Sequence, residues 1–302
     1  MASVLAAADI GSNTAHLLVA ATDGQLVMRI DNVNEWIPLG EEVARFGEIP
    51  KERIDELVSA IREFKRVAVL RAAKSLYVFA TEAIRAASNQ EAVLRRIKND
   101  TGLHVHVVSP QREAELSMRG IRLDTRGVDA NLMFEVGGGS AQIAGLDGDR
   151  MVDEISLPLG TGRVIASYGL HNPCPAPTVN EARRQVTEIL KSEAFKSEGG
   201  IAIACGGVAR GLWRALHPDG EKELTLEEID YIAWSTARLT VPRIIERFDV
   251  KPKRAGTLLA GSIVYGELMR HYGCSMLHLS EFGVREGAVL EMSTGQGLGT
   301  PL

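Results

Sequence analysis

The feature that most constrains this chain is an internal repeat of a strand–turn–strand–turn–strand pattern. The first copy contains SVLAAADIGSNTAHLLVAATDG, and the second, ANLMFEVGGGSAQIAGLDGD, follows about 120 residues later. The aligned copies pair Asp9 with Glu135, Gly11 with Gly137, Thr14 with Ser140 and His16 with Gln142. Further on, IPLG at 37–40 matches LPLG at 157–160. A repeat of this length predicts two related domains, one beginning at each copy.

Helical and extended patterns alternate after each copy. Residues 50–73 place Ile54, Leu57, Ile61 and Phe64 on one helical face, and LYVFAT then has the pattern of a buried strand. Ser109 and Pro110 form a good N-cap and first-turn pair for a helix over QREAELSMRGI. After the second copy, GIAIACGG is a strand pattern, and helices are predicted over 208–216, 225–240 and 255–273. The fold class is therefore α/β.

Composition excludes several function classes. The 302 residues carry a net charge of −5, so nothing indicates a nucleic-acid or membrane binder, and a polyanionic substrate would need a local basic site. No segment approaches the ~18 apolar residues of a membrane span, and MASVLAAADI lacks the basic start of a signal peptide. The spacing of Cys174, Cys205 and Cys274 fits no zinc or CxxC motif, so we expect buried free thiols in a reducing compartment, the cytoplasm.

The first candidate site is the turn DIGSNT. Asp9 ends a strand and could hold a metal ion or a water, while Gly11 permits a tight turn. Ser12 and Asn13 add backbone N–H groups and side-chain donors that can hold a phosphate. Taken alone, the same string is also typical of a plain β-turn.

The second candidate site is EVGGGS. Gly137, Gly138 and Gly139 let the backbone approach an anion with no Cβ in the way. The lysine of a P-loop is missing, and a strand rather than the helix of a dinucleotide-binding fingerprint follows. In a third turn, ACGGVARG, Gly206 and Gly207 lie between a strand and a helix, which suits either a phosphate contact or close helix–strand packing. Together, the three turns predict a two-domain clamp around phosphate oxygens.

Seven segments carry a resemblance to a known family. They are DIGSNTAHLLVA, FATEAIRAASN, EAELSMRGI, EVGGGSAQI, SLPLGTGRV, ACGGVARGL and FGVREGAVLE. In this order they resemble the motifs of the exopolyphosphatase/guanosine pentaphosphate phosphohydrolase (Ppx/GppA) family, and they cover nearly the whole chain. The chain resembles a short member that lacks the C-terminal helical domain of longer relatives. A sugar or acetate kinase of the same superfold fits GVREG and ATEAIR less well.

The resemblance implies a two-domain actin-like fold of the actin/sugar-kinase/Hsp70 superfamily, related to ribonuclease H, with an interdomain cleft. We expect domain I over residues 1–123 and domain II over 124–284. A C-terminal helix over about 285–302 would pack back on domain I. The substrate is expected between DIGSNT and EVGGGS, and the family implies a homodimer.

The implied reaction is removal of the terminal phosphate of polyphosphate, or of guanosine pentaphosphate to give guanosine tetraphosphate, by water with Mg²⁺ or Mn²⁺. Glu113 matches the family's general base, and Arg85 matches an arginine that grips phosphate. Both roles suit their chemistry, although without the resemblance Arg85 is equally a solvated helix charge and Glu113 a helix-dipole partner. The residues expected to bind phosphate are Gly11, Ser12, Asn13, Gly137, Gly138, Gly139, Ser140, Gly206 and Gly207, and those expected at the metal are Asp9, Glu135 and Gln142.

Three positions depart from the family's usual pattern. The family usually has DIGGGSTE where this chain has EVGGGSAQ, so Glu135 replaces an aspartate and Gln142 a glutamate. Gln142 cannot act as a base or carry charge, but its amide oxygen can accept a hydrogen bond or a metal. Arg112 replaces the first of two glutamates that usually precede Ala114.

Two interpretations follow from these departures. The chain is an active phosphatase with an altered metal site, or a catalytically reduced protein that senses polyphosphate or guanosine penta- and tetraphosphate. The presence of Asp9, Arg85 and Glu113 favours the enzyme. Basic residues that could guide a polyanion are Arg85, Arg95, Arg96 and Lys98.

Overall fold

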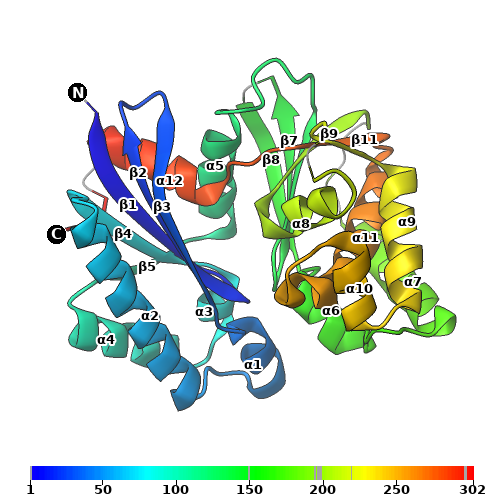
Figure 1. Cartoon of the computed structure of the whole chain (residues 1–302), viewed down its shortest axis with the longest axis horizontal. Helices are drawn as coiled ribbons and strands as arrows, with labels where there is room; N and C mark the ends of the chain where they lie inside the picture. The colour runs from blue at the N-terminus through cyan, green and yellow to red at the C-terminus, as the bar shows by residue number, and fades with distance from the viewer. Residues whose placement is uncertain (1, 149, 194, 196–198, 219, 296–297) are drawn as a thin grey trace. The chain divides into compact units, whose positions relative to one another are not determined.

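A computed structural model describes residues 2–148, 150–193, 195, 199–218, 220–295 and 298–302. The chain forms two compact units, and each has its own sheet and its own core (Figure 1). Unit 1 comprises Met1–Leu123 and Phe282–Leu302, and unit 2 comprises Asp124–Glu281. No helix in the described ranges is long and apolar enough to cross a membrane.

The sheet of unit 1 has the order β12-β4-β1-β2-β3, with β5 also paired to β4. The first three strands form an antiparallel meander, and β4 and β5 add in parallel. The strands are β1 (Ser3–Ile10), β2 (Thr14–Thr22), β3 (Val27–Trp36), β4 (Ser75–Ala80), β5 (Val105–Val107) and β12 (Thr300–Pro301). Because β1 and β4 are buried on both faces, their sequences are almost continuously apolar.

Helices cover both faces of this sheet. The helices of unit 1 are α1 (Leu39–Phe46), α2 (Lys51–Leu70), α3 (Glu82–Ala86), α4 (Gln90–Thr101), α5 (Pro110–Ile121) and α12 (Val284–Ser293). The predicted apolar face of α2, with Leu57, Ile61 and Phe64, packs on one side of the sheet together with α4. On the other side, α5 and α12 enclose a smaller core around Leu116 and Val289.

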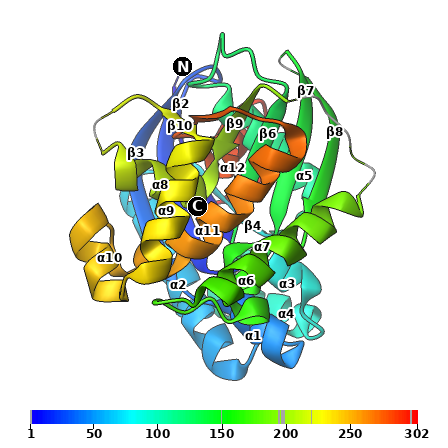
Figure 2. The ribbon, with the colours of Figure 1, turned by 90° about the vertical axis from the view of Figure 1, so that its right-hand side faces the viewer.

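The sheet of unit 2 has the order β10-β11-β9-β6-β7-β8. Its strands are β6 (Leu132–Val136), β7 (Ala141–Asp147), β8 (Arg150–Leu157), β9 (Ile201–Cys205), β10 (Glu223–Thr225) and β11 (Met276–Leu279). Its helices are α6 (Thr161–Tyr168), α7 (Ala176–Lys191), α8 (Gly206–Leu216), α9 (Leu226–Arg238), α10 (Val241–Phe248) and α11 (Pro252–Tyr272). Figure 2 shows α7, α9 and α11 side by side over the sheet, with α11 the most deeply buried of the three.

The internal repeat is present in three dimensions. In both copies an antiparallel meander is extended by a parallel strand, β4 beside β1 and β9 beside β6. The strand register also shifts at the same place in the second hairpin of each copy. The shift lies between Val19 and Ala20 in the β2–β3 pair and between Gly145 and Leu146 in the β7–β8 pair. The predicted α/β class is therefore confirmed.

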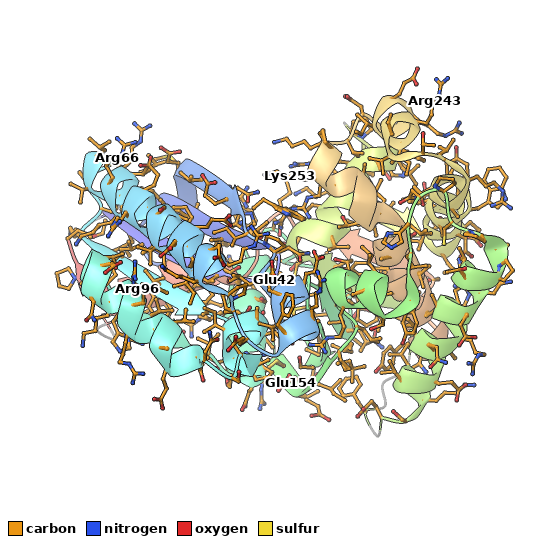
Figure 3. All side chains as sticks on the ribbon, turned by 90° about the horizontal axis from the view of Figure 1, so that it is seen from below. Glu42, Arg66, Arg96, Glu154, Arg243 and Lys253 are labelled. Atoms are coloured by element: carbon orange, nitrogen blue, oxygen red, sulfur yellow. The ribbon has the colours of Figure 1, made fainter. Side chains whose placement is uncertain are left out.

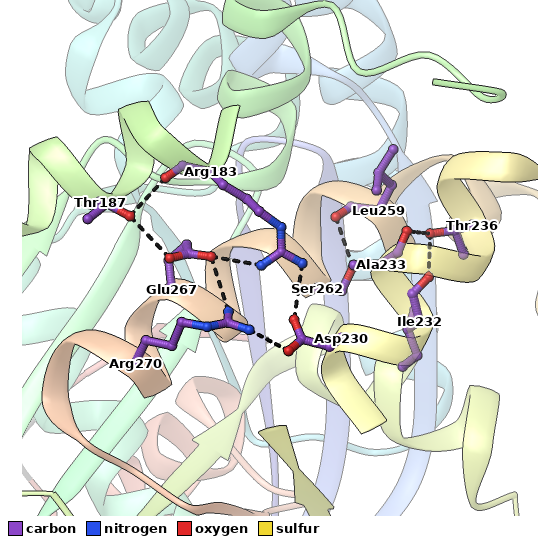
Figure 4. Close-up of polar contacts among 10 residues, drawn as sticks. All are labelled: Arg183, Thr187, Asp230, Ile232, Ala233, Thr236, Leu259, Ser262, Glu267 and Arg270. Atoms are coloured by element: carbon purple, nitrogen blue, oxygen red, sulfur yellow. Dashed lines mark hydrogen bonds and ion pairs between the residues drawn. The ribbon is translucent and has the colours of Figure 1, made fainter. Parts of the chain in front are cut away.

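A partly buried ion network joins α7, α9 and α11 (Figure 4). Arg183 donates to Glu267 at 2.8 Å and to Asp230 at 3.1 Å, and Arg270 pairs with the same two carboxylates. Thr187 completes the network by donating to Glu267 at 3.1 Å. Because each of the two carboxylates meets two guanidinium groups, the charges that α11 buries are compensated.

Charged side chains cover the outer faces of the helices (Figure 3). Several of the basic residues expected to guide a polyanion have carboxylate neighbours. Arg96 pairs with Asp100 at 2.6 Å and Asp55 at 3.1 Å, and Arg95 lies 3.5 Å from Glu91. The positive charges of these two arginines are therefore compensated locally by neighbouring carboxylates.

The structure also corrects several element predictions. The helix expected over about 285–302 ends at Ser293, and Thr300–Pro301 pairs with β4 instead. The helix predicted to begin at Ala255 begins at Pro252, and α10 was not predicted. All three cysteines are buried and free, as expected.

Candidate active site

The turns after β1 and β6 have the same backbone structure. The N–H of Gly11 donates to the carbonyl of Thr14 at 2.9 Å, and the N–H of Gly137 donates to the carbonyl of Ser140 at 2.8 Å. Each turn is thereby closed on itself between two antiparallel strands. The two predicted phosphate loops are therefore structural counterparts, one in each unit.

The carbonyl groups of the three glycines in the second turn face α6. Gly137 accepts from the N–H of Thr161 at 2.9 Å, and Gly138 accepts from the N–H of Gly162 at 2.8 Å. Gly139 accepts from Nε of Arg163 at 3.1 Å. The N–H and C=O of one trans peptide point in opposite directions, so the N–H groups of residues 138, 139 and 140 face away from α6. Three successive N–H groups on one side of a turn are an arrangement that can bind an anion.

The first turn is held against its own following segment in a similar way. Ser12 accepts from the N–H of Gly40 at 2.7 Å, and Asn13 accepts from the N–H of Ile37 at 3.0 Å. The hydroxyl of Ser12 donates to Oε2 of Glu82 at 3.0 Å. Glu82 was not expected at the site, and it ties the turn to the start of α3.

The repeated PLG sequence explains why both turns hold this shape. A Cβ at Gly160 would overlap the backbone of Gly138 and Gly139, and a Cβ at Gly40 would lie 2.7 Å from Cβ of Ser12. Glycine is therefore required at the point where each helix begins against its turn. The matching IPLG and LPLG segments position the two candidate phosphate loops.

Glu135 lies at the end of β6, where Asp9 lies at the end of β1. Burial and the nearby charge of Glu135 raise the pKa of the Cys205 thiol well above its usual range, and this thiol is hydrogen-bonded to Glu135. Gly206 has a φ of +83°, and a Cβ there would lie 3.2 Å from Oε1 of Glu135. The absence of a Cβ at Gly206 thus leaves room for Glu135, whose side chain is one methylene longer than that of aspartate.

Arg85 and Glu113 come together in unit 1. Ser109 caps α5 by accepting from the N–H of Arg112 at 3.1 Å, which confirms the predicted helix start and fixes Glu113 in the first turn. Arg85 on α3 donates from Nη1 to the carbonyl of Val108 at 2.7 Å and lies 3.9 Å from Oε2 of Glu113. A guanidinium and a carboxylate, both largely buried, are thereby held side by side.

Sequence reasoning missed an arginine cluster at the start of α8. Nη2 of Arg254 would lie 2.6 Å from a Cβ at Gly207, so this guanidinium lies directly on the first turn of α8. Burial, together with the positive charges of Arg210 and Arg214, lowers the pKa of Arg254. A helix N-terminus with a guanidinium on its first turn attracts anions. The only available signal was the KPKR sequence that precedes the predicted start of α11.

The predicted site residues therefore fall into local groups. In unit 1, Gly11, Ser12 and Asn13 form the turn that follows Asp9. In unit 2, Gln142 pairs with Glu135 across β6 and β7, and both border the GGGS turn of residues 137–140. Among the described residues, no three side chains of His, Cys, Asp or Glu gather into a metal-binding group.

The fold and its repeated turns define an α/β protein of the actin-like class. Solved structures with the same fold include the PPX-GPPA enzyme of Aquifex aeolicus, with a TM-score of 0.80 and 24% identity, covering 96% of this chain and 100% of that one. An exopolyphosphatase from Cytophaga hutchinsonii gives a TM-score of 0.86 at 20% identity, covering 99% and 100%. The predicted actin-like fold is confirmed.

Sequence comparison identifies the family. The chain is 29% identical to exopolyphosphatase 1 of Mycobacterium leprae over 310 residues, which cover 97% of this chain and 91% of that protein. The model of the Ppx/GppA phosphatase family matches residues 18–295. The chain belongs to the Ppx/GppA phosphatase family and is a hydrolase of phosphoric anhydrides.

Proposed function

We propose that this protein is an exopolyphosphatase that removes the terminal phosphate of inorganic polyphosphate by attack of water. The observation that carries the proposal is the GGGS turn, in which the carbonyl groups of residues 137–139 accept hydrogen bonds from α6 while three successive N–H groups face the other way. Such a turn suits the equatorial oxygens of a phosphoryl group, over which charge is spread in the transition state. The name of the Mycobacterium leprae relative supports this choice of substrate.

Glu113 and Arg85 are the proposed catalytic pair. Glu113 would accept a proton from the attacking water as its oxygen forms the new bond to phosphorus. The bond from phosphorus to the bridging oxygen then breaks, and the shortened chain leaves as an anion. Nη1 of Arg85 lies 3.9 Å from Oε2 of Glu113. Arg85 would hold the transferred phosphate through the planar donors of its guanidinium group.

The family resemblance implies a divalent cation, Mg²⁺ or Mn²⁺, and the donor set fits one. Asp9 and Glu135 present carboxylate oxygens beside the two turns, which suits a hard cation. In the part of the chain that the structure describes, no three acidic, His or Cys side chains gather into a metal site. Mg²⁺ usually takes only one or two carboxylates and completes its coordination with waters and substrate phosphates. We assign Asp9 in unit 1 and Glu135 in unit 2 as candidate ligands, each beside its own turn, with Gln142 adding at most an amide oxygen. When bound, the ion would neutralise phosphate charge.

Arg254 is proposed to bind a phosphate further along the substrate. Replacing Arg254 by glutamine is expected to raise KM for polyphosphate by about 10–100-fold, because a charge-assisted hydrogen bond is worth roughly 1.5–3 kcal/mol. The effect should shrink as salt is raised. Arg243→Gln is the matched control, since Arg243 is exposed and paired with Glu246 at 2.7 Å. Equal KM values for the two variants would show that Arg254 does not bind the substrate.

A second candidate function is a sensor of polyphosphate or of guanosine penta- and tetraphosphate. It is favoured by one observation, the uncharged Gln142 at a position where the family usually has a carboxylate. The deciding experiment measures phosphate release from long polyphosphate and from guanosine pentaphosphate while Mg²⁺ is titrated. Release from either substrate supports the enzyme and identifies the preferred substrate. Tight binding of these compounds without release would support the sensor.

The cellular location and the oligomeric state are also matters of proposal. We propose a cytoplasmic homodimer, on the basis of the family resemblance and of three buried free thiols. Sedimentation of the purified chain tests the dimer. A monomer over the micromolar concentration range would contradict it.

A further inference from the structure

Gln142 is a buried polar side chain with an unused donor. It lies in β7 and is 2% exposed. Its amide nitrogen, Nε2, is enclosed and has no hydrogen-bond partner within the described ranges of the chain. Buried amides are rarely left unpaired, because an unmade hydrogen bond is costly away from water. An enclosed donor of this kind is available to an acceptor that the protein itself does not supply, such as a bound anion.

The strand register places Gln142 beside the candidate phosphate loop. Ala141 and Ile143 face the main core of unit 2, so Gln142 faces the opposite side of the sheet. Phe134 and Val136 also face that core, which puts Glu135 on the same side as its cross-strand partner Gln142. The buried side chain of Gln142 therefore lies beside Glu135 on the same face of the sheet. Gln142 follows the turn of residues 137–140 by two positions.

The chemistry of the amide distinguishes it from the carboxylate that the family usually has. A glutamate offers only acceptors, so beside a phosphate it needs a cation to bridge the two negative groups. An amide nitrogen is a donor, and it can reach a phosphate oxygen directly.

We propose that Gln142 donates a hydrogen bond through Nε2 to a phosphate oxygen held by the GGGS turn, so that unit 2 binds polyphosphate without a divalent cation. This inference rests on the proposed phosphate-binding role of the turn. It assigns Gln142 to the substrate rather than to the metal.

Calorimetric titration of the full chain with inorganic tripolyphosphate in EDTA tests the proposal. The wild-type chain should bind. Gln142→Glu should bind at least 10-fold more weakly, because it removes the donor and places a carboxylate against phosphate. Gln142→Leu has a side chain of similar volume without a charge or a donor. Its affinity for tripolyphosphate should lie between those of the wild-type chain and Gln142→Glu. Circular dichroism of each variant checks that the fold is retained.

The same titrations with Mg²⁺ complete the test, in a Glu113→Gln background so that no substrate is consumed. Mg²⁺ should restore binding by Gln142→Glu and change wild-type binding by less than about threefold. The proposal is overturned if the wild-type chain binds tripolyphosphate only with Mg²⁺, or if Gln142→Glu binds as tightly as wild type in EDTA. The binding pattern can hold even if polyphosphate is never hydrolysed, so failure of the proposed enzyme activity is a separate outcome.

Discussion

Replacing Glu113 by glutamine is expected to lower kcat for phosphate release from polyphosphate by about 10²–10⁴-fold, the usual contribution of a positioned general base. Glutamine keeps the shape of the side chain but cannot accept the proton of the attacking water. The start of α5 should be unchanged, because its cap is formed by Ser109 and not by Glu113. Initial rates at saturating substrate measure the effect.

Glu115→Gln is the matched control for this variant. Glu115 lies on the same helix but is exposed and pairs with Arg112 at 3.0 Å. Its replacement should change kcat by less than about twofold, since exposed ion pairs contribute little. A Glu113→Gln variant with the rate of Glu115→Gln would show that another group acts as the base.

The second large effect is on stability. Replacing Gly287 by alanine is expected to lower the free energy of unfolding by about 3 kcal/mol or more. A Cβ at Gly287 on α12 would overlap the carbonyl oxygen of Leu116 on α5, and a Cβ at Gly120 would overlap the carbonyl of Gly283. Because both obstacles are backbone atoms, the two helices would have to move apart. Denaturant titration measures the loss.

Gly256→Ala provides the comparison. Gly256 lies within α11 with no atom within 4 Å of an added Cβ, so alanine should leave stability unchanged or raise it by up to ~1 kcal/mol. If Gly287→Ala were as stable as Gly256→Ala, close packing of α5 on α12 would not be what holds these helices. The presence of glycine at positions 283 and 287 would then need another explanation.

The contact between α5 and α12 also explains one departure from the family's sequence pattern. Arg112 pairs with Glu291 of α12, whose carboxylate is almost fully buried, and Arg119 lies 3.8 Å from the same carboxylate. A glutamate at position 112 would place a second negative charge beside Glu291. Arginine at this position therefore compensates a buried charge next to the proposed base, and local sequence gave no indication of it.

Local signals in the sequence predicted much of the fold. The repeat of strand and turn patterns around Asp9 and Glu135 led to the two similar sheets, and Ser109-Pro110 located the start of α5. These features depend on residues close together in the chain, where propensity and capping rules apply. The same holds for the glycine turns, whose backbone requirements are local.

The contacts that were not predicted join residues distant in sequence. Arg254 reaches Gly207 from the start of α11, and Ser12 reaches Glu82 on α3. Cys205 is hydrogen-bonded to Glu135 because β9 pairs with β6 in parallel. Strand order and register decide which of these side chains meet, and neither follows from periodicity alone.

The central claim is that the chain shortens polyphosphate from its end with water. The most direct test incubates the full chain with long polyphosphate and Mg²⁺, follows free orthophosphate, and sizes the remaining polymer by gel electrophoresis. We expect the wild-type chain to release orthophosphate without a pool of mid-length fragments, and Glu113→Gln to lose this release. Background-level release by both proteins, or internal cleavage into fragments, would contradict it.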